Sequence, residues 1–440
     1  MRHNRLWSWA ITSATVALLV SACGGGGGSG GIGNGGGNGG IGNGGGNGGG
    51  GNGGGGTSPT IAVGIQNAEW VAYQDGANGE WTTLSASDAS GGSVPATAPD
   101  GRYSLAFVCS GTKPTVYVIH ATRQELPQVE FTCPSTPQTV SVDVSVAGLN
   151  GGTAAVSIGN AAATLTNTQQ LPVAPGTHDV IAVRFTNNGI PNRVWVERNR
   201  LFTSNTTYTI DFTQADSGSV RVLDINAGAL TVLGLSQPGE AAVASVTLQS
   251  SSSRLIIGLG TTRSSATPIA YPIIPDNILE PNERFLVSVR DITGRRSVEQ
   301  ALTTLPDPLP VELPSLFTAP TFSAAPSGAV RFVADNITYP ETSIIGYRKI
   351  VDASDVRYEY FMTSGWLGSA TSYTTPVLES LVGWNPALSL QRGAPADVAL
   401  SVYVSRNLTP EWVWRYTQGA LLPNGSALRI ATTPPQTITP

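Results

Sequence analysis

Hydrophobic and polar residues alternate along much of the chain after Thr57. The stretch Val140-Ser-Val-Asp-Val-Ser-Val146 alternates strictly, and Tyr208–Phe212 and Ser219–Ile225 follow nearly the same pattern. A period of two residues places side chains of one kind on one face of an extended strand. These stretches therefore predict half-buried β-strands.

Short turn signals separate the predicted strands. The dipeptides Asp75-Gly76, Asn150-Gly151 and Pro175-Gly176 are typical of tight turns. Apart from one turn over Leu378–Val382, we find no amphipathic pattern that predicts a helix. Many short strands with frequent turns are typical of sandwiches and barrels, so the sequence predicts an all-β fold of tandem β-sandwich domains.

A pair of strand-like stretches recurs along the chain, and each pair predicts a β-hairpin. The four pairs are Asp100–Cys109 with Thr115–His120, Pro175–Arg184 with Arg193–Arg198, Pro281–Arg290 with Arg295–Glu299, and Pro395–Val404 with Glu411–Tyr416. The recurrence predicts four sandwiches, over residues 58–136, 137–216, 217–315 and 316–440.

The second pair begins Pro-Gly-Thr-His-Asp-Val-Ile-Ala-Val-Arg, residues 175–184. A strand of small and branched residues after a Pro-Gly turn resembles the carboxypeptidase regulatory-like and transthyretin-like sandwich modules. This resemblance covers one segment of the chain and implies a non-catalytic module.

The first 22 residues have the pattern of an export signal. Arg2 and Arg5 precede the short apolar stretch Ala10–Val20, and the small residues Ser21 and Ala22 follow it. The positive start, the apolar core and the small residues are typical of a secretory signal peptide. The apolar stretch is shorter than the roughly 18 residues that a membrane-spanning helix needs.

The next residue makes this signal more specific. Val20-Ser21-Ala22-Cys23 resembles the lipobox of bacterial lipoproteins. The resemblance implies cleavage before Cys23, acylation of that cysteine and anchoring in a lipid bilayer, which several acyl chains make stable. Gly24 in place of Asp implies transfer to the outer membrane. The alternative is an ordinary secretory signal followed by an unrelated cysteine.

Glycine and asparagine dominate residues 24–57. The unit Gly-Gly-Ile-Gly-Asn-Gly-Gly-Gly-Asn occurs at residues 30–38 and again at 39–47. It resembles the calcium-binding β-roll repeat, but Gly35 and Gly44 stand where that repeat has its aspartate. A stretch this poor in apolar side chains cannot offset the entropy of ordering glycine. Residues 23–57 are therefore predicted to be a lipid anchor with a disordered linker.

The charge balance argues against nucleic-acid binding. Removing Arg2 and Arg5 with the signal leaves 22 basic and 29 acidic residues, a formal charge of −7. The longest basic cluster is Arg295-Arg296. Binding to nucleic acid or to an anionic membrane surface requires concentrated positive charge, so neither is expected of the folded body.

Cys109 and Cys133 are the remaining cysteines. In an exported chain an even pair predicts a disulfide, worth roughly 3 kcal/mol on the chain-entropy model. The alternative is two free, buried thiols.

Candidate catalytic residues are few. His120 and His178 remain after signal cleavage, and both fall in predicted strands or hairpin edges. Asp276, Glu280 and Glu283 form the densest acidic group, which could hold calcium, serve a glycosidase or form a solvated turn. We assign no catalytic residue, no metal site and no cofactor, and expect that the protein is not an enzyme.

Aromatic residues gather near the C-terminus. On a strand, Trp412, Trp414 and Tyr416 would share one face, which could stack on sugars or anchor a protein partner. The alternative is that they belong to the core of the last sandwich.

These observations favour an exported lipoprotein, anchored through Cys23 to the cell envelope, with a non-catalytic structural, adhesive or envelope-interaction role. Its partners would be the bilayer and a protein or glycan of the envelope, and not nucleic acid. Two alternatives stay open. One is a cell-surface carbohydrate-binding module, and the other is a hydrolase whose site is assembled across domains.

Overall fold

The computed structural model describes residues 59–135, 138–217, 219–235, 239–250 and 252–440. The predicted signal at 1–22, Cys23 and the glycine-rich segment 24–57 lie outside the described residues. Within the described ranges β-strands dominate and the helices are short, so the predicted all-β fold of tandem sandwiches is confirmed.

The first sandwich consists of seven strands in two sheets. β1 lies between β4 and β7 and runs parallel to β7, while the second sheet has the order β3-β2-β5-β6. Its elements are β1 (Thr60–Gln66), β2 (Trp70–Asp75), β3 (Trp81–Thr83), α1 (Ala86–Gly91), β4 (Gly92–Pro95), β5 (Arg102–Cys109), β6 (Thr115–Thr122) and β7 (Gln128–Thr132).

The second sandwich repeats this strand order. β8 lies between β11 and β14, parallel to β14, and the other sheet runs β10-β9-β12-β13 before β15 joins its edge. The strands are β8 (Val140–Ala147), β9 (Thr153–Ile158), β10 (Ala161–Leu165), β11 (Gln169–Val173), β12 (Gly176–Phe185), β13 (Pro191–Phe202), β14 (Thr206–Asp211) and β15 (Val220–Asp224).

The third sandwich has the same order again, with β16 parallel to β22 and the second sheet β18-β17-β20-β21. The elements are β16 (Asn226–Leu233), β17 (Ala242–Gln249), β18 (Arg254–Thr262), β19 (Ile269–Ile273), the 3-10 helix η1 (Asp276–Ile278), β20 (Arg284–Asp291), β21 (Arg296–Leu302) and β22 (Leu309–Glu312).

The fourth sandwich is a modified copy. Its larger sheet keeps the order, as β26-β25-β28-β29, but β23 lies antiparallel beside β24 where the other sandwiches have their seventh strand. The elements are β23 (Thr321–Ala324), β24 (Phe332–Asp335), β25 (Ile344–Asp352), β26 (Arg357–Thr363), α2 (Ser364–Leu367), β27 (Ser372–Thr374), η2 (Pro386–Leu388), β28 (Ala396–Val404), α3 (Pro410–Thr417), β29 (Ala427–Thr432) and β30 (Gln436–Ile438).

Three of the four predicted hairpins form as expected: β5–β6, β12–β13 and β20–β21 are antiparallel pairs. The fourth prediction was wrong in its second strand. Residues 411–416 lie in helix α3, and the antiparallel partner of β28 on that side is β29. The helix is thus inserted into the connection that is a short turn in the other copies.

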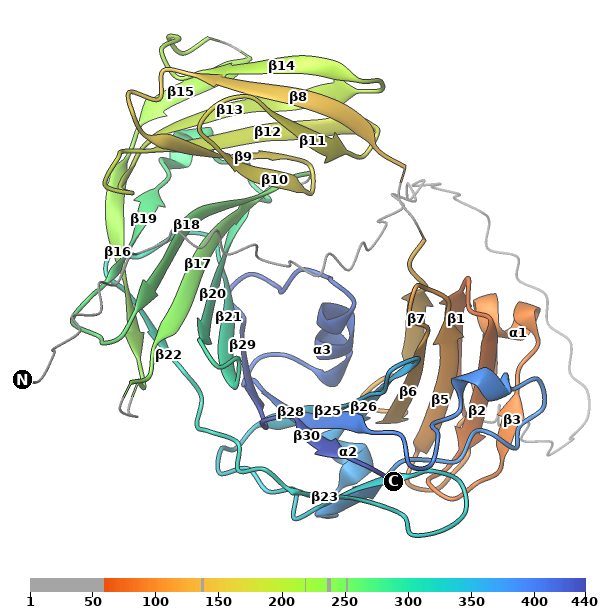
Figure 1. Cartoon of the computed structure of the whole chain (residues 1–440). Coiled ribbons are helices and arrows are strands. Elements are labelled where there is room, and N and C mark those ends of the chain that lie inside the picture. Colours follow the sequence, from red (N-terminus) through yellow and green to blue (C-terminus); the bar gives the residue numbers. More distant parts are fainter. Residues whose placement is uncertain (1–58, 136–137, 218, 236–238, 251) are drawn as a thin grey trace, which may run out of the picture.

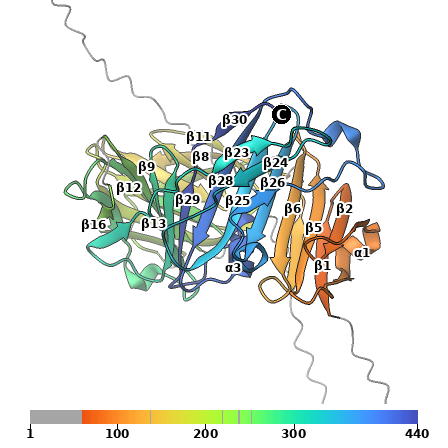
Figure 2. The same ribbon diagram turned by 90° about the horizontal axis from the view of Figure 1, so that it is seen from below.

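The sandwiches are joined edge to edge. β21 pairs antiparallel with β29, and β26 pairs parallel with β6. The larger sheets of the first, third and fourth sandwiches thereby form one continuous sheet, with the order β18-β17-β20-β21-β29-β28-β25-β26-β6-β5-β2-β3, which we call the common sheet. Figure 2 shows its strands side by side from β29 to β2, and Figure 1 shows the chain bending into an arc. The boundaries at 136, 216 and 315 stay predictions.

The common sheet has a hydrophobic core on each face. Around β26, Tyr358, Tyr360 and Met362 face β23, β24 and β27 of the fourth sandwich, whereas Phe361 faces the opposite core. That second core combines the interior of the first sandwich with helix α3. In Figure 1, α3 and β23 lie on opposite sides of β25 and β28.

The predicted disulfide between Cys109 and Cys133 is present, with 5.3 Å between the Cα atoms. Cys109 ends β5 and Cys133 directly follows β7, so the bond ties the two sheets of the first sandwich together.

Candidate functional site

Helix α3 replaces the predicted aromatic strand. The Thr409 Oγ1 atom accepts a hydrogen bond from the Trp412 backbone N–H at 3.4 Å, and Pro410 occupies the first helical turn. A threonine cap followed by proline is a favoured helix start, since it satisfies or removes free N–H groups. Glu411 and Arg415, four residues apart, form an ion pair at 2.7 Å. This local signal could have been found in the sequence.

The helix separates Trp414 from the other two aromatic candidates. Residues two apart on a helix point about 200° apart, so Trp414 faces away from Trp412 and Tyr416, which are four residues apart and lie on one side. Trp412 is 36% exposed, Trp414 is only 4% exposed and Tyr416 is half-buried. The prediction of one aromatic face was wrong, and for Trp414 the alternative of a core position is correct.

The buried face of α3 packs across two sandwiches. The ring of Trp414 lies 5.9 Å from that of Phe131 on β7 and 5.5 Å from that of Phe361 on β26. With its amide assigned to the orientation that satisfies both neighbours, Gln418 donates to the Glu130 carbonyl oxygen at 2.9 Å and accepts the Trp414 indole N–H. These contacts fix the helix between the first and fourth sandwiches.

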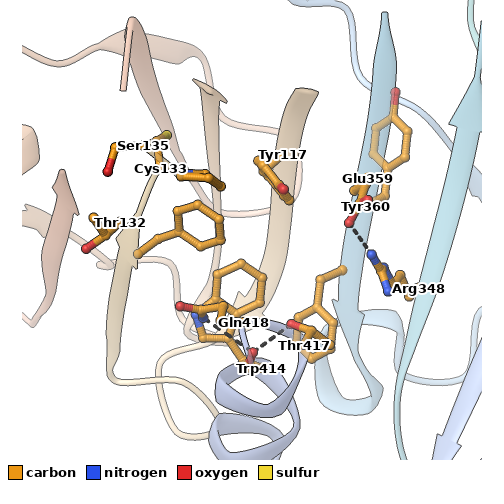
Figure 3. A pocket seen from close by; sticks show the side chains of 13 residues that line it. Tyr117, Thr132, Cys133, Ser135, Arg348, Glu359, Tyr360, Trp414, Thr417 and Gln418 are labelled. Atoms are coloured by element: carbon orange, nitrogen blue, oxygen red, sulfur yellow. Dashed lines mark hydrogen bonds and ion pairs between the residues drawn. The ribbon is translucent and has the colours of Figure 1, made fainter. Parts of the chain in front are cut away.

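A pocket of about 360 Å³ opens beside this helix (Figure 3). Its floor is the common sheet, with Tyr117 from β6, Arg348 from β25 and Glu359 from β26. One wall is Phe131 and Thr132 of β7 with the disulfide residue Cys133, and the other is Trp414, Thr417 and Gln418 of α3. Of the predicted candidates, the structure places Trp414 and Cys133 at this pocket, whereas Trp412 and Tyr416 are not among its lining residues.

The pocket contains one closely paired set of charges. The Arg348 guanidinium donates to the Glu359 carboxylate, which also meets Arg357 Nε at 2.7 Å. Burial alone would lower the pKa of Arg348, but Tyr403 and Glu359 beside it raise that pKa above its usual value. Arg348 therefore stays charged, and the ion pair is a fixed feature of the pocket floor.

A second carboxylate lies on the same face of the common sheet. Burial raises the pKa of Glu299 on β21 to about 7, although the Ser288 hydroxyl donates to it at 2.7 Å and Arg290 lies near. Its negative charge in turn raises the pKa of Tyr416, which burial has already raised. Glu299 thus binds a proton in the folded protein at pH values where an ordinary glutamate has lost it.

His120 is a buried structural residue. Its ring nitrogens bond to the Ser104 hydroxyl at 2.7 Å and to the Tyr373 hydroxyl at 2.8 Å, and its ring stacks on Trp366. Burial lowers the pKa of His120 to about 3, so the imidazole is neutral. Ser104 is fully buried and cannot meet a substrate, and the bond from His120 to Tyr373 joins the first and fourth sandwiches.

His178 and Glu283 are structural as well, whereas Asp276 and Glu280 are exposed to solvent. His178 Nε2 bonds to the carbonyl oxygen of Ala174 at 2.8 Å. Glu283, which is 5% exposed, accepts hydrogen bonds from Arg198 of the second sandwich, and Arg198 also meets buried Asp179 at 3.3 Å. Glu283 is therefore neither in a solvated turn nor free for a substrate.

The described part of the chain lacks two features. Within it, no group of three or more His, Cys, Asp or Glu residues could hold a metal ion. Over the same residues, no helix has the length and apolar character that a membrane crossing requires.

Comparisons with known proteins add little. No protein-family model and no curated protein matches the chain. A Ca²⁺-stabilized adhesin with which an Antarctic bacterium binds ice is 12% identical, with 85% of this chain and 89% of that chain covered and a TM-score of 0.16. The chicken CNTN1 FN1–FN3 domains are 11% identical, with coverage of 87% and 96% and a TM-score of 0.16. At these values neither likeness carries an argument about this chain.

Apart from Trp414 and Cys133, the residues that line the pocket were missed by sequence reasoning. Tyr117, Phe131, Arg348 and Glu359 come from four strands in two sandwiches. Their meeting depends on the parallel pairing of β26 with β6, for which the sequence contains no local signal.

Proposed function

We propose that this chain is an exported, lipid-anchored protein of the cell envelope with a non-catalytic adhesive or structural role. The observation that supports this most is the use of its buried polar residues. The histidine and the acidic residue that could have served catalysis, His120 and Glu283, join neighbouring sandwiches instead. Because these buried polar groups bind neighbouring sandwiches to one another, they keep the sandwiches in a fixed arrangement, which suits a structural or adhesive role.

The junctions between sandwiches support the same role. β21–β29 and β26–β6 continue one sheet across three sandwiches, and backbone hydrogen bonds of this kind resist bending at the junctions. The Glu125 carboxylate adds a tie, because it accepts hydrogen bonds from the Thr363 hydroxyl and, at 2.7 Å, from the Gly365 N–H. The disulfide is consistent with export, since such bonds persist in oxidising compartments.

The proposed anchor rests on the sequence Val20-Ser21-Ala22-Cys23. The test is to express the full chain and Cys23→Ser in a Gram-negative host, feed a labelled fatty acid, and separate membranes from soluble protein. The wild type should carry label and sediment with the membranes, and Cys23→Ser should lose both properties. Ser29→Ala, in the glycine segment, is the matched control and should behave as the wild type.

Adhesion is tested on the same strains. Cells with the anchored chain should adhere to an abiotic surface or to one another more than cells with Cys23→Ser, because the variant protein is exported but is not attached to the membrane. Membrane retention of Cys23→Ser would overturn the anchor. Equal adhesion of the two strains would overturn the adhesive role and leave the structural one, which an envelope-integrity assay measures.

A further inference from the structure

We propose that the pocket between β7 and α3 binds an uncharged pyranose ring, the unit of a neutral glycan. The inference goes beyond the proposed function and does not depend on the lipid anchor. It also differs from the sequence-based expectation, since the site consists of residues from two sandwiches and not of one aromatic strand.

The size and position of the pocket suit a small ligand. A volume of about 360 Å³ is within the range of small-molecule sites, which commonly lie where domains meet. The site lies where β7 of the first sandwich and α3 of the fourth face each other on the same side of the common sheet (Figure 3). Thr132, beside Phe131, is exposed to solvent and marks the rim.

Three aromatic rings form the apolar part of the pocket. Tyr117 and Phe131 lie 4.8 Å apart between ring centroids and are tilted by 47°, and Trp414 follows Phe131 at 5.9 Å with a tilt of 34°. Rings set at such angles make a concave apolar surface. The C–H face of a sugar ring packs on surfaces of this kind.

The charges in the pocket select a neutral, hydroxyl-rich ligand. The Glu359 carboxylate is paired with both Arg348 and Arg357, so an anion would compete with Glu359 for the Arg348 guanidinium, and a cation would compete with Arg348 and Arg357 for the carboxylate. Breaking a partly buried pair is costly. A hydroxyl can donate to Glu359 and accept from Arg348 while the pair stays intact. A wholly apolar ligand would remove water from the pair without replacing its hydrogen bonds.

The test measures binding of glucose, galactose, mannose and N-acetylglucosamine to the full chain by titration calorimetry and saturation-transfer NMR. Glucuronate and glucosamine are the charged counterparts. We expect at least one neutral sugar to bind, and glucuronate and glucosamine to bind at least tenfold more weakly than that sugar. Thr417→Trp, which fills the pocket from α3, and Thr132→Trp, which blocks the exposed rim, should each weaken binding at least tenfold.

Trp412→Ala is the matched control, because Trp412 lies on α3 but does not line the pocket. It should bind as the wild type does. The proposal is overturned if none of the four neutral sugars binds at millimolar concentration, if the charged sugars bind equally well, or if binding survives in a folded Thr417→Trp or Thr132→Trp variant. The two blocking sites are on different elements, so a folding failure of one leaves the other decisive.

Discussion

The larger sheets of the first and fourth sandwiches share one strand order but differ in the connection between their last two strands, β5–β6 and β28–β29. In the first, β5 passes to β6 through residues 110–114, a turn. In the fourth, β28 passes to β29 through residues 405–426, which contain α3. The inserted helix covers the face of the common sheet opposite β23, β24 and β27, and one wall of the pocket comes from it. The longer connection therefore places a helix against the junction between the first and fourth sandwiches.

The largest expected effect is on the free energy of unfolding, and it compares the buried side of α3 with its exposed side. Trp414→Ala should lower the free energy of unfolding by about 3–5 kcal/mol, because it leaves a cavity against Phe131 and Phe361. Trp412→Ala should change it by less than about 0.5 kcal/mol, since that side chain is at the surface. Denaturant unfolding measures both, and equal losses would contradict the assigned helix orientation.

The next effect concerns the disulfide of the first sandwich. Its residue Cys109 ends β5, whereas the equivalent strand of the fourth sandwich, β28, leads into α3. Replacing Cys109 and Cys133 together with alanine should destabilise the protein by roughly 3 kcal/mol, because the unfolded chain loses a cross-link over 24 residues. Thermal unfolding of the oxidised wild type and the double variant measures the loss. A reducing agent should lower the stability of the wild type and leave that of the variant unchanged.

A smaller effect depends on pH and tests the face under α3. Because the pKa of Glu299 is raised from 4.5 to about 7, its contribution to stability is fully present below pH 4.5 and is lost as the pH rises through 7. Glu299→Gln should remove this dependence, worth about 2–3 kcal/mol after allowance for partial exposure. Unfolding of wild type and variant from pH 4 to 8 measures it, with the exposed Glu312→Gln as control. Parallel curves for wild type and Glu299→Gln would contradict the burial of this carboxyl.

The smallest effect concerns the solvent side of α3. Arg415→Ala removes the ion pair with Glu411 and the contact of the guanidinium with the Trp412 ring at 5.7 Å. Exposed pairs of this kind are screened by water and salt, so the loss should be about 0.5 kcal/mol or less and should shrink in high salt. A loss above 1 kcal/mol would indicate that this face of the helix packs against more of the protein than the structure describes.

Much of the fold could be predicted from the chain itself. The alternating stretch Val140–Val146 is strand β8 nearly as expected, and three of the four recurring pairs are hairpins. Such patterns are local, because a two-residue period and a turn dipeptide act over a few residues. The fourth pair failed because the local helix start at Thr409-Pro410 outweighs the apparent alternation of the aromatic residues that follow it.

The sequence by itself determined the half-buried strands and the turns between them, because both depend on residues close together in the chain. It also determined the disulfide, because Cys109 and Cys133 are the two cysteines that remain after Cys23. It also contains the residues 20–23 on which the proposed anchor rests. Only the tertiary structure decided that β26 pairs with β6, that Trp414 is buried while Trp412 is exposed, and that Arg348 and Glu359 meet three aromatic rings in one pocket. These outcomes depend on edges and faces of separate sandwiches, whose contacts are set by packing between distant segments and not by any local period.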